Sequence, residues 1–359
     1  MMKDLNIVGI QQLGVGVKNL HEAWGWYKKY FGIDVRILEE KAPSEYMVQY
    51  TGGIVRNRHA AIAISLQGGG GFEIWNHTDF EPRPAAFDVQ MGDLGICAGK
   101  IKCKDPDKAY EWFKEQGQVL PGKVEDVEGR KQFFVKDPYG NFFQLVPSNT
   151  WLREEGKHTG ATYGAILGCS DAERSLAFYR DILGYDKVVY DKEGHFTDLA
   201  CLPGGKGKFR RILLTHSEKR SGPLSQLFGE SEIELLQPLD RAPRRIFEGR
   251  YWGELGFIHL CFDIRGMDAI RELCLQKGYP LTVDTAQILK EKSFDMGDAA
   301  GVFAYNEDPD GTLIEYVETH KIPVVKKLGI HINLQKRDPR KPLPLWMLKV
   351  MCFLKAKDI

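Results

Sequence analysis

Two segments of the sequence share a pattern but differ in one ionisable side chain. Residues 136–145 read KDPYGNFFQL and residues 307–316 read EDPDGTLIEY. Each has Asp-Pro-x-Gly, which predicts a tight turn, and then a short apolar strand. Four residues after the glycine stands Gln144 in the first segment and Glu315 in the second. Strand alternation places Glu315 on an apolar face, where a carboxylate is costly unless it is paired or binds a metal.

Other polar residues also stand on apolar strands. His259 lies in GFIHLCFDI, where a histidine taken alone is usually a hydrogen-bonded core residue. Glu73 in GFEIWN can equally face solvent, and Gln12 stands beside another glutamine. Glu234 shares a strand face with Glu232, which favours an ordinary polar face. The residues alone therefore leave ligand and surface roles open.

The elements that carry these residues belong to a repeated unit. Each copy has a strand, a capping residue, an amphipathic helix and a glycine, followed by β-like runs. The four helical segments read NLHEAWGWYKKYFG, DPDKAYEWFKEQG, DAERSLAFYRDILG and GMDAIRELCLQKG. We therefore predict a β-α-β-β-β unit that is used four times.

The repeats set the predicted domains. Residues 1–149 form a first module and residues 161–320 a second module, with a polar linker over 150–160. The distance between equivalent positions grows along the chain. The second module should therefore carry insertions, which we expect around 217–230 and 284–300.

The composition limits the classes of function. The 359 residues carry 49 Lys and Arg against 49 Asp and Glu, and zero net charge argues against a whole-protein nucleic-acid surface. Seven cysteines without a Cys-x-x-Cys pair indicate reduced thiols rather than a disulfide frame. The start, MMKDLNIVGI, lacks the apolar run of a signal peptide. We therefore expect a cytoplasmic protein with a small-molecule substrate and no nucleic-acid partner.

The last segment, residues 321–359, falls outside the repeats. It carries ten Lys and Arg against two Asp, so its charge is about +8. Its end, PLWMLKVMCFLK, can form a short apolar helix with lysines to one side. We expect this tail to pack on the protein or cover a site as a lid. Contact with a partner chain and, after that, with a membrane surface are the alternatives.

The four units and the two Asp-Pro-x-Gly hairpins resemble the vicinal oxygen chelate superfamily. This superfamily includes glyoxalase I, methylmalonyl-CoA epimerase, extradiol dioxygenases and bleomycin-resistance proteins. The resemblance covers about residues 8–320. It implies an α+β fold in which four βαβββ units form two cupped, mixed sheets with helices outside. It also implies a divalent metal in a cup, which substrates chelate through two neighbouring oxygens.

The resemblance places metal ligands on the first and last strands of each unit. In unit order these positions hold Gln12 and Glu73, Ala98 and Gln144, Gly164 and Glu234, and His259 and Glu315. Units one and four together offer an imidazole, two carboxylates and an amide oxygen. Such a set suits an octahedral divalent ion such as Zn, Ni, Mn or Fe, and it resembles one variant of the glyoxalase I site.

Two pairings of units stay open. If unit one shares a cup with unit four, the ligands are Gln12, Glu73, His259 and Glu315, and the two halves of the chain exchange partners. If units three and four pair, the ligands are Glu234, His259 and Glu315. That alternative set is one histidine short of the iron triad of extradiol dioxygenases. We favour the exchanged pairing.

The resemblance also implies a class of reaction. We expect a metal-dependent lyase or isomerase of glyoxalase or epimerase type, with Glu315 or Glu73 as the base. Glutathione dependence is not expected, because the family's glutathione-contact positions hold Gly16, His77 and Leu255 here. The alternatives are an extradiol-type dioxygenase, for which a second histidine is missing, and a non-catalytic binding protein of the resistance type.

Overall fold

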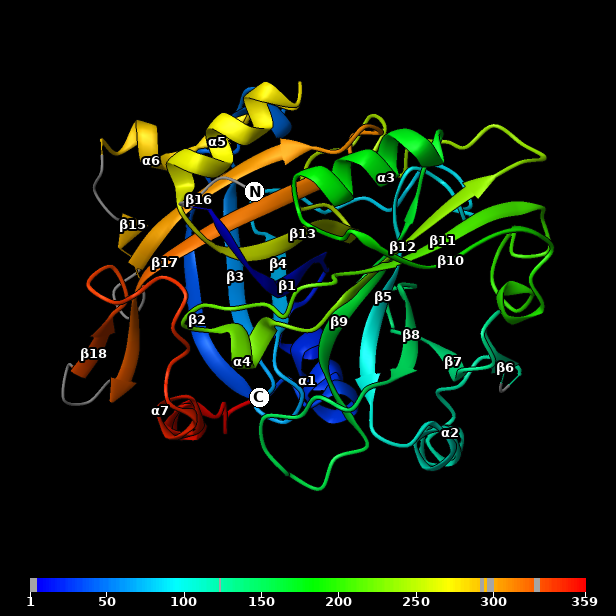
Figure 1. Cartoon of the computed structure of the whole chain (residues 1–359), viewed down its shortest axis with the longest axis horizontal. Coiled ribbons are helices and arrows are strands. Elements are labelled where there is room, and N and C mark those ends of the chain that lie inside the picture. Colours follow the sequence, from blue (N-terminus) through cyan, green and yellow to red (C-terminus); the bar gives the residue numbers. More distant parts are fainter. Residues whose placement is uncertain (1–4, 123, 291–293, 296–299, 326–329) are drawn as a thin grey trace.

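The chain folds into two curled β-sheets that lie side by side, with helices on their outer faces (Figure 1). In this computed structural model the described residues are 5–122, 124–290, 294–295, 300–325 and 330–359. Both sheets are mixed, since parallel and antiparallel neighbours occur in each. The predicted α+β class with two cupped sheets is confirmed.

The first half of the chain contains two of the predicted β-α-β-β-β units. The first consists of β1 (Asn6–Gly16), α1 (Leu20–Phe31), β2 (Val35–Pro43), β3 (Asn57–Ile64) and β4 (Gly71–His77). The second consists of β5 (Gly95–Cys103), α2 (Pro106–Glu115), β6 (Val124–Glu125), β7 (Lys131–Lys136) and β8 (Phe142–Pro147). Both helices begin at a polar cap, because Asn19 and Asp105 accept backbone N–H groups of the first turn.

The second half repeats this order with additional short elements. The third unit consists of β9 (Thr159–Gly168), α3 (Ala172–Asp181), β10 (Lys187–Gly194), β11 (Phe209–Thr215), α4 (Ser225–Phe228) and β12 (Glu232–Pro238). The fourth consists of β13 (Gly256–Arg265), α5 (Met267–Gln276), β14 (Val283–Asp284), α6 (Thr285–Ile288), β15 (Phe294–Asp295), β16 (Ala300–Glu307) and β17 (Leu313–Val325). Helices α4 and α6 lie in the two regions where insertions were predicted. Residues 291–293 and 296–299 of the second insertion lie outside the described residues.

Neither sheet is formed by one half of the sequence. The first sheet has the strand order β14-β16-β17-β13-β1-β4-β3-β2, so it joins units one and four. The second has the order β10-β11-β12-β9-β5-β8-β7-β6, so it joins units two and three. The centre of each sheet is an antiparallel pair from opposite halves, β1 with β13 and β9 with β5. Of the two pairings left open by the sequence, the structure has the exchanged one.

Equivalent tyrosines link the two sheets. Tyr27 of α1 donates a hydrogen bond to Asp137 in the turn before β8, at 2.7 Å. Tyr179 of α3 donates to Asp308 in the turn before β17, at 2.9 Å. Burial raises the pKa of Asp308 to about 6. The Asp-Pro-x-Gly turns thus hold the helix of one unit against the hairpin of the next.

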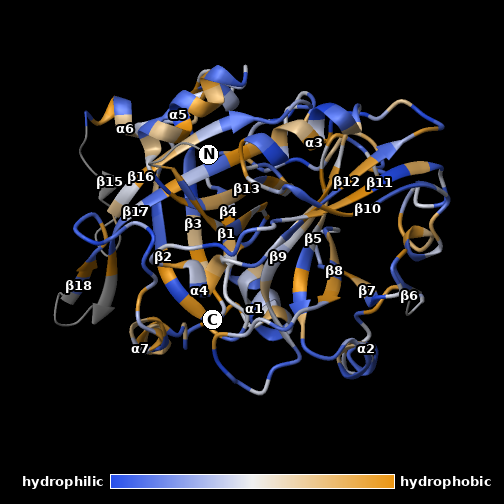
Figure 2. Ribbon diagram, in the orientation of Figure 1, coloured by the Kyte–Doolittle hydropathy of each residue, from blue (hydrophilic) through white to orange (hydrophobic). Residues whose placement is uncertain are grey.

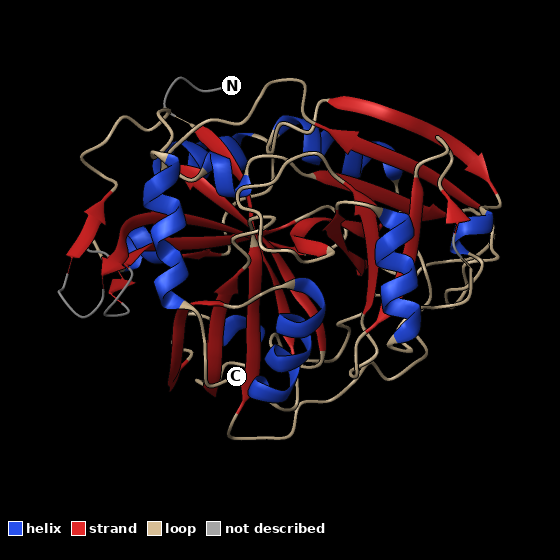
Figure 3. Ribbon diagram, turned by 90° about the horizontal axis from the view of Figure 1, so that it is seen from below, coloured by secondary structure: helices blue, strands red, loops and turns tan. Residues whose placement is uncertain are grey.

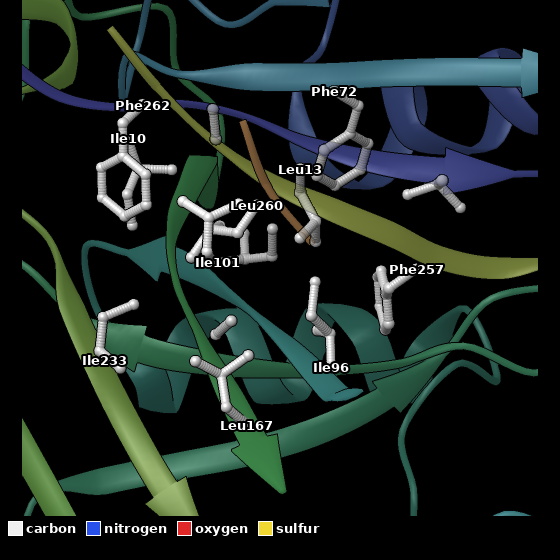
Figure 4. Packing of buried hydrophobic residues seen from close by; sticks show 14 of the residues in the cluster. Ile10, Leu13, Phe72, Ile96, Ile101, Leu167, Ile233, Phe257, Leu260 and Phe262 are labelled. Carbon is white, nitrogen blue, oxygen red and sulfur yellow. The ribbon is translucent and has the colours of Figure 1, made fainter. Parts of the chain in front are cut away.

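The core lies where the central strands of the two sheets pack against each other. Figure 2 shows apolar residues along these strands and hydrophilic residues on the outer sides of the helices, and Figure 3 shows the helices around the strands from below. The buried residues labelled in Figure 4 are Ile10, Leu13, Phe72, Phe257, Leu260 and Phe262 of the first sheet and Ile96, Ile101, Leu167 and Ile233 of the second. Residues that alternate with this set point to the concave faces, and the chemistry lies there.

The C-terminal tail packs on the first sheet. It contains β18 (Ile330–Asn333), α7 (Leu345–Lys349) and a 3-10 turn over Val350–Leu354. Met351 is buried, and Lys355 lies 3.0 Å from the carboxylate of Asp34. Three large apolar side chains of the tail stay exposed, namely Leu345, Trp346 and Phe353. Among the described residues, no helix is long and apolar enough to cross a membrane.

Candidate metal centre

Four polar side chains meet on the concave face of the first sheet, and we call them the His259 cluster. They are Gln12 of β1, Glu73 of β4, His259 of β13 and Glu315 of β17, on four neighbouring strands. The Nε2 atom of His259 lies 3.1 Å from Oε2 of Glu73 and 3.2 Å from Oε2 of Glu315. The Nε2 atom of Gln12 lies 3.3 and 3.4 Å from the same two oxygens. The structure thus brings together the residues named for the exchanged pairing.

The His259 cluster is enclosed and incompletely satisfied. The exposed fraction is 0% for His259, 1% for Gln12 and 6% for Glu315. Within the described part of the chain, Oε1 of Gln12 and Nδ1 of His259 have no hydrogen-bond partner, and Nε2 of His259 lies near both carboxylates without a well-aligned hydrogen bond to either. Unpaired buried polar atoms cost free energy, so the cluster has the unmet bonding capacity that a ligand would satisfy.

The spacing of the donor atoms suits a divalent ion. Two atoms that bind an ion at right angles from about 2.1 Å lie about 3.0 Å apart, which agrees with the two His259 contacts. One donor atom each of Glu73, His259 and Glu315 lies within 4.8 Å of the others. The amide of Gln12 would present its oxygen after a rotation that exchanges O and N, which have nearly the same shape. The donor set therefore fits a six-coordinate metal with positions left for another ligand.

A glycine makes room for the histidine. Gly14 is paired with His259 across β1 and β13. A Cβ atom at position 14 would lie 2.6 Å from Cε1 and Nε2 of the imidazole. Any other residue there would therefore push the ring out of the cluster. Sequence reasoning missed Gly14, although a glycine two residues after a candidate ligand on the same strand was a usable signal.

Tyr305 fixes one of the carboxylates. Its hydroxyl donates to Oε1 of Glu315 at 2.7 Å, which leaves Oε2 directed at His259 and Gln12. Burial raises the pKa of Glu315, and the nearby His259 partly opposes this. Burial lowers the pKa of His259, but the carboxylates of Glu315 and Glu73 outweigh burial and raise it overall. A bound cation would relieve the repulsion between the two carboxylates.

The cluster borders a cavity of about 340 Å³. Gln12, Glu73 and Glu315 line it, and the side chains of Trp75 and Trp252 lie beside them. Most of the remaining wall is apolar, as is usual for a small-molecule site. A molecule in the cavity can therefore reach the donor atoms of the cluster.

The equivalent place in the second sheet holds ion pairs, and we call them the Lys100 cluster. Lys100 lies 2.7 Å from Glu232 and 2.6 Å from Glu234. Arg211 also binds Glu234, and Arg130 lies 2.9 Å from Glu232. The prediction that Glu234 stands on an ordinary polar face is wrong, because both glutamates are buried. As the alternative metal ligand, Glu234 is separated from His259 and Glu315, which lie in the other sheet.

The two hairpins of the sequence therefore end in different surroundings. The amide of Gln144 donates a hydrogen bond to the amide oxygen of Gln132. The amide of Gln132 donates to Asp198 at 2.6 Å, and Asp198 lies 2.7 Å from Arg211. Together with Lys100, these residues give the second cup a network of amides and ion pairs. Nearby Lys and Arg cations oppose the binding of a metal cation.

A second group of possible metal ligands lies on the surface and was not predicted. Nε2 of His21 and Nε2 of His59 lie 2.6 and 3.0 Å from the same oxygen of Glu39. The other oxygen of Glu39 lies 3.0 Å from Arg36. No spacing in the sequence indicated this group, because α1, β2 and β3 bring the three residues together only in the fold.

Comparisons with known proteins agree with the fold. Residues 9–145 match the family described as "Glyoxalase/Bleomycin resistance protein/Dioxygenase superfamily". An E144Q mutant of glyoxalase I from Zea mays has a TM-score of 0.54 at 15% identity, over 88% of this chain and 94% of that one. A putative dioxygenase from Bacillus subtilis has a TM-score of 0.57 at 14% identity, over 97% and 96%. Residues 9–145 therefore match the glyoxalase, bleomycin-resistance and dioxygenase superfamily, and the chain as a whole has a glyoxalase I-like fold.

A further match concerns only a small part of much longer proteins. The E3 SUMO-protein ligase RanBP2 of Homo sapiens is 22% identical over 181 residues, which are 45% of this chain and 6% of that protein. RanBP2-like and GRIP domain-containing protein 3 of Homo sapiens is 22% identical over 181 residues, which are 10% of its length. The chain thus spans a small fraction of these relatives.

Proposed function

We propose that the His259 cluster binds one divalent metal ion, and that the protein is a metal-dependent lyase or isomerase of glyoxalase or epimerase type. Glu73, His259 and Glu315 would hold the ion, with the amide oxygen of Gln12 as a fourth ligand. The observation that carries the proposal is the convergence of these donors beside a cavity, with Oε1 of Gln12 and Nδ1 of His259 without a hydrogen-bond partner.

The chemistry follows from what each group can do. A divalent ion that binds two neighbouring substrate oxygens acidifies the adjacent C–H bond. Glu315 is held by Tyr305 and is therefore suited to stay in place. Glu73 is half-buried and lines the cavity, and within the described part of the chain no tyrosine hydroxyl holds it. We therefore assign it as the ligand that would also act as the base, which takes the proton from carbon and returns it to the neighbouring carbon.

Two observations support a substrate other than a glutathione adduct and a reaction other than extradiol cleavage. The positions of the family's glutathione contacts are not among the described residues that line the cavity, and His77 is instead bonded to the carbonyl of Trp252 at 2.9 Å. No histidine is among the described residues that line the cavity, so none there could act as a second histidine ligand with His259.

Metal titration of chelator-treated protein tests the binding site. We expect one ion of Zn²⁺, Ni²⁺ or Mn²⁺ per chain, with affinity reduced at least 100-fold by His259→Ala and by Glu315→Gln. Gln144→Ala changes the position equivalent to Glu315 in the second sheet and should leave the affinity unchanged. His21→Ala shows whether additional metal binds the surface group. Unchanged metal affinity in His259→Ala would refute the site.

Deuterium exchange tests the reaction. We expect metal-loaded protein in D₂O to exchange the carbon-bound hydrogen of 2-hydroxy ketones. Glu73→Gln should slow exchange at least 100-fold even at saturating metal. Exchange that is as fast in Glu73→Gln as in the unmodified protein would refute this base, and metal binding without any exchange would favour a binding protein of the resistance type.

A further inference from the structure

Part of the cavity wall is built by segments that lie outside the repeated unit. Leu227 and Phe228 come from α4, the short helix of the insertion between β11 and β12. Met351 comes from the C-terminal tail, and Ile322 from the end of β17, where the tail begins. Together with Ile64 of β3 they form an apolar part of the cavity wall, which we call the apolar end.

These walls are fixed parts of the fold. Leu227, Phe228, Ile322 and Met351 are buried and belong to one hydrophobic cluster. The tail that carries Met351 is anchored farther along, where the backbone N–H of Ala356 donates to the carbonyl of Asp34 at 2.8 Å. Arg36 and Asp358 form a second anchor at 2.8 Å. The 3-10 turn that follows α7 packs against β2, and α4 packs against β1 (Figure 1).

The cavity provides no free cation for an anionic group. Among the described residues that line it, Arg58 is the one Lys or Arg side chain. Arg58 is already bound to the carboxylate of Glu40, donates to the carbonyl of Pro43 at 2.6 Å, and lies over the ring of Trp75 at 5.2 Å. A phosphate or a carboxylate along the wall would have to displace Glu40. The wall therefore selects against phosphorylated and coenzyme A-linked substrates.

We propose that the substrate is an amphiphile whose head carries two neighbouring oxygens and whose body is an uncharged aliphatic chain. This inference rests on the proposed metal site, because the head must bind at the His259 cluster. The chain lies along the apolar wall towards Leu227, Ile322 and Met351. Aliphatic side chains dominate that end, whereas the aromatic rings of Trp75, Trp252 and Tyr305 lie near the head.

The volume of the cavity and the hydrophobic effect set the gain in affinity that is expected for each added methylene. A cavity of about 340 Å³ is at the lower end of the range that encloses a small organic ligand. Each methylene removed from water contributes about 0.8 kcal/mol, which is about a fourfold gain in affinity. The gain should stop when the chain has filled the cavity.

Alkyl hydroxamates test this inference, because their two neighbouring oxygens chelate metal and their chain length can be varied. Titration calorimetry on the zinc-loaded full-length protein would compare acetohydroxamate, hexanohydroxamate and decanohydroxamate. We expect hexanohydroxamate, which has four more methylenes, to bind about 200-fold more tightly than acetohydroxamate. Met351→Gln and Leu227→Asp should reduce this ratio at least tenfold and leave acetohydroxamate affinity within twofold.

Controls separate the two proposals. Leu275→Asp changes a leucine of α5 that is 61% exposed and lies outside the cavity, so the chain-length ratio should stay unchanged. Loss of zinc and of all hydroxamate binding in the unmodified protein would refute the metal site itself. Binding of all three hydroxamates with equal affinity would refute the amphiphile and leave the metal site standing. Stronger binding of benzohydroxamate than of hexanohydroxamate would refute the aliphatic chain.

Discussion

The two sheets have the same strand order and register but opposite chemistry at their centres. His259 faces Gly14 in the first sheet, whereas Ala98 faces Ile166 at the equivalent position of the second. The larger side chain of this residue pair therefore stands on β13 in the first sheet and on β9 in the second. The cup that has the imidazole can collect metal ligands, and the cup that lacks it is filled by a branched apolar side chain.

The comparison extends to the charges. Glu73 and Glu234 occupy equivalent places, opposite Gly14 and Ile166 respectively. In the second sheet the charge of Glu234 is balanced by Lys100 and Arg211, and these cations outweigh burial and lower its pKa. In the first sheet no Lys or Arg is recorded within salt-bridge distance of Glu73, as far as the chain is described. The difference indicates that the second sheet balances its buried carboxylates with Lys and Arg side chains of the protein. The first sheet leaves its carboxylates to be balanced by a ligand.

The largest effect is expected from Lys100→Met in the second sheet. Removal of this ammonium group leaves Glu232 and Glu234 buried with one cation fewer, and breaking a buried ion pair costs about 3–5 kcal/mol. Cys261→Ala is the matched control, because Cys261 holds the equivalent position in the first sheet, and it should cost about 1 kcal/mol. Urea unfolding measures both, and equal losses would mean that the Lys100 cluster does not stabilise the second sheet.

Gly14→Ala should have the next largest effect, which is a loss of metal affinity. The added Cβ would displace the ring of His259, so we expect affinity for Zn²⁺ to fall about 100-fold. Ile166→Ala at the equivalent position of the second sheet should leave the affinity unchanged and only cost stability. Competition with a chelator of known affinity measures both variants. Retention of full affinity in Gly14→Ala would show that the imidazole is not confined by β1.

The smallest effect concerns how stability depends on pH at another pair of equivalent positions. Burial raises the pKa of Asp263 in the first sheet to about 7 and lowers the pKa of Lys102 in the second to about 8. Asp263 holds its proton more tightly when folded, so its contribution to the free energy of unfolding is lost as pH rises from about 4 to about 7. Lys102 binds its proton more weakly when folded, so stability should rise between about pH 8 and about pH 10.5.

Two isosteric variants isolate these slopes. Asp263→Asn should remove the first slope and make the protein more stable than the unmodified one at pH 7.5, by about 1–2 kcal/mol, since the interior is partly polarisable. Lys102→Met should remove the second slope. Urea unfolding at several pH values measures both, and parallel stability curves for Asp263→Asn and the unmodified protein would contradict the assigned pKa shift.

The sequence predicted the fold well because the same local signals occur in several of its units. The caps Asn19, Asp105 and Asp171 and the two Asp-Pro-x-Gly turns are local signals, and each occurs in more than one unit, so four βαβββ units were identified with their order. The residues of the His259 cluster were named from the strand positions at which the resembled superfamily carries its metal ligands. Which units share a sheet was not decided, because the strand pattern is the same whichever partner lies at its edge.

The rest depended on contacts between residues that are distant in the sequence. Lys100 meets Glu232 across 132 positions, and nothing near either residue indicates the other. Tyr305 was overlooked because its role depends on the hydroxyl reaching Glu315 across a strand pair. The apolar end of the cavity was equally hidden, since Leu227 belongs to an insertion and Met351 to the tail, and neither follows the repeat.

The exchange of partners between the two halves has a consequence for the order of folding. Strand β1 is made first, but its antiparallel neighbour β13 begins only at Gly256. During synthesis the first unit therefore has an unpaired strand edge until most of the chain has been translated, which exposes it to wrong pairing. The second sheet can close once β12 has been made, because units two and three are consecutive. We therefore expect the sheet with the Lys100 cluster to form first and to template the later closure of the sheet with the His259 cluster.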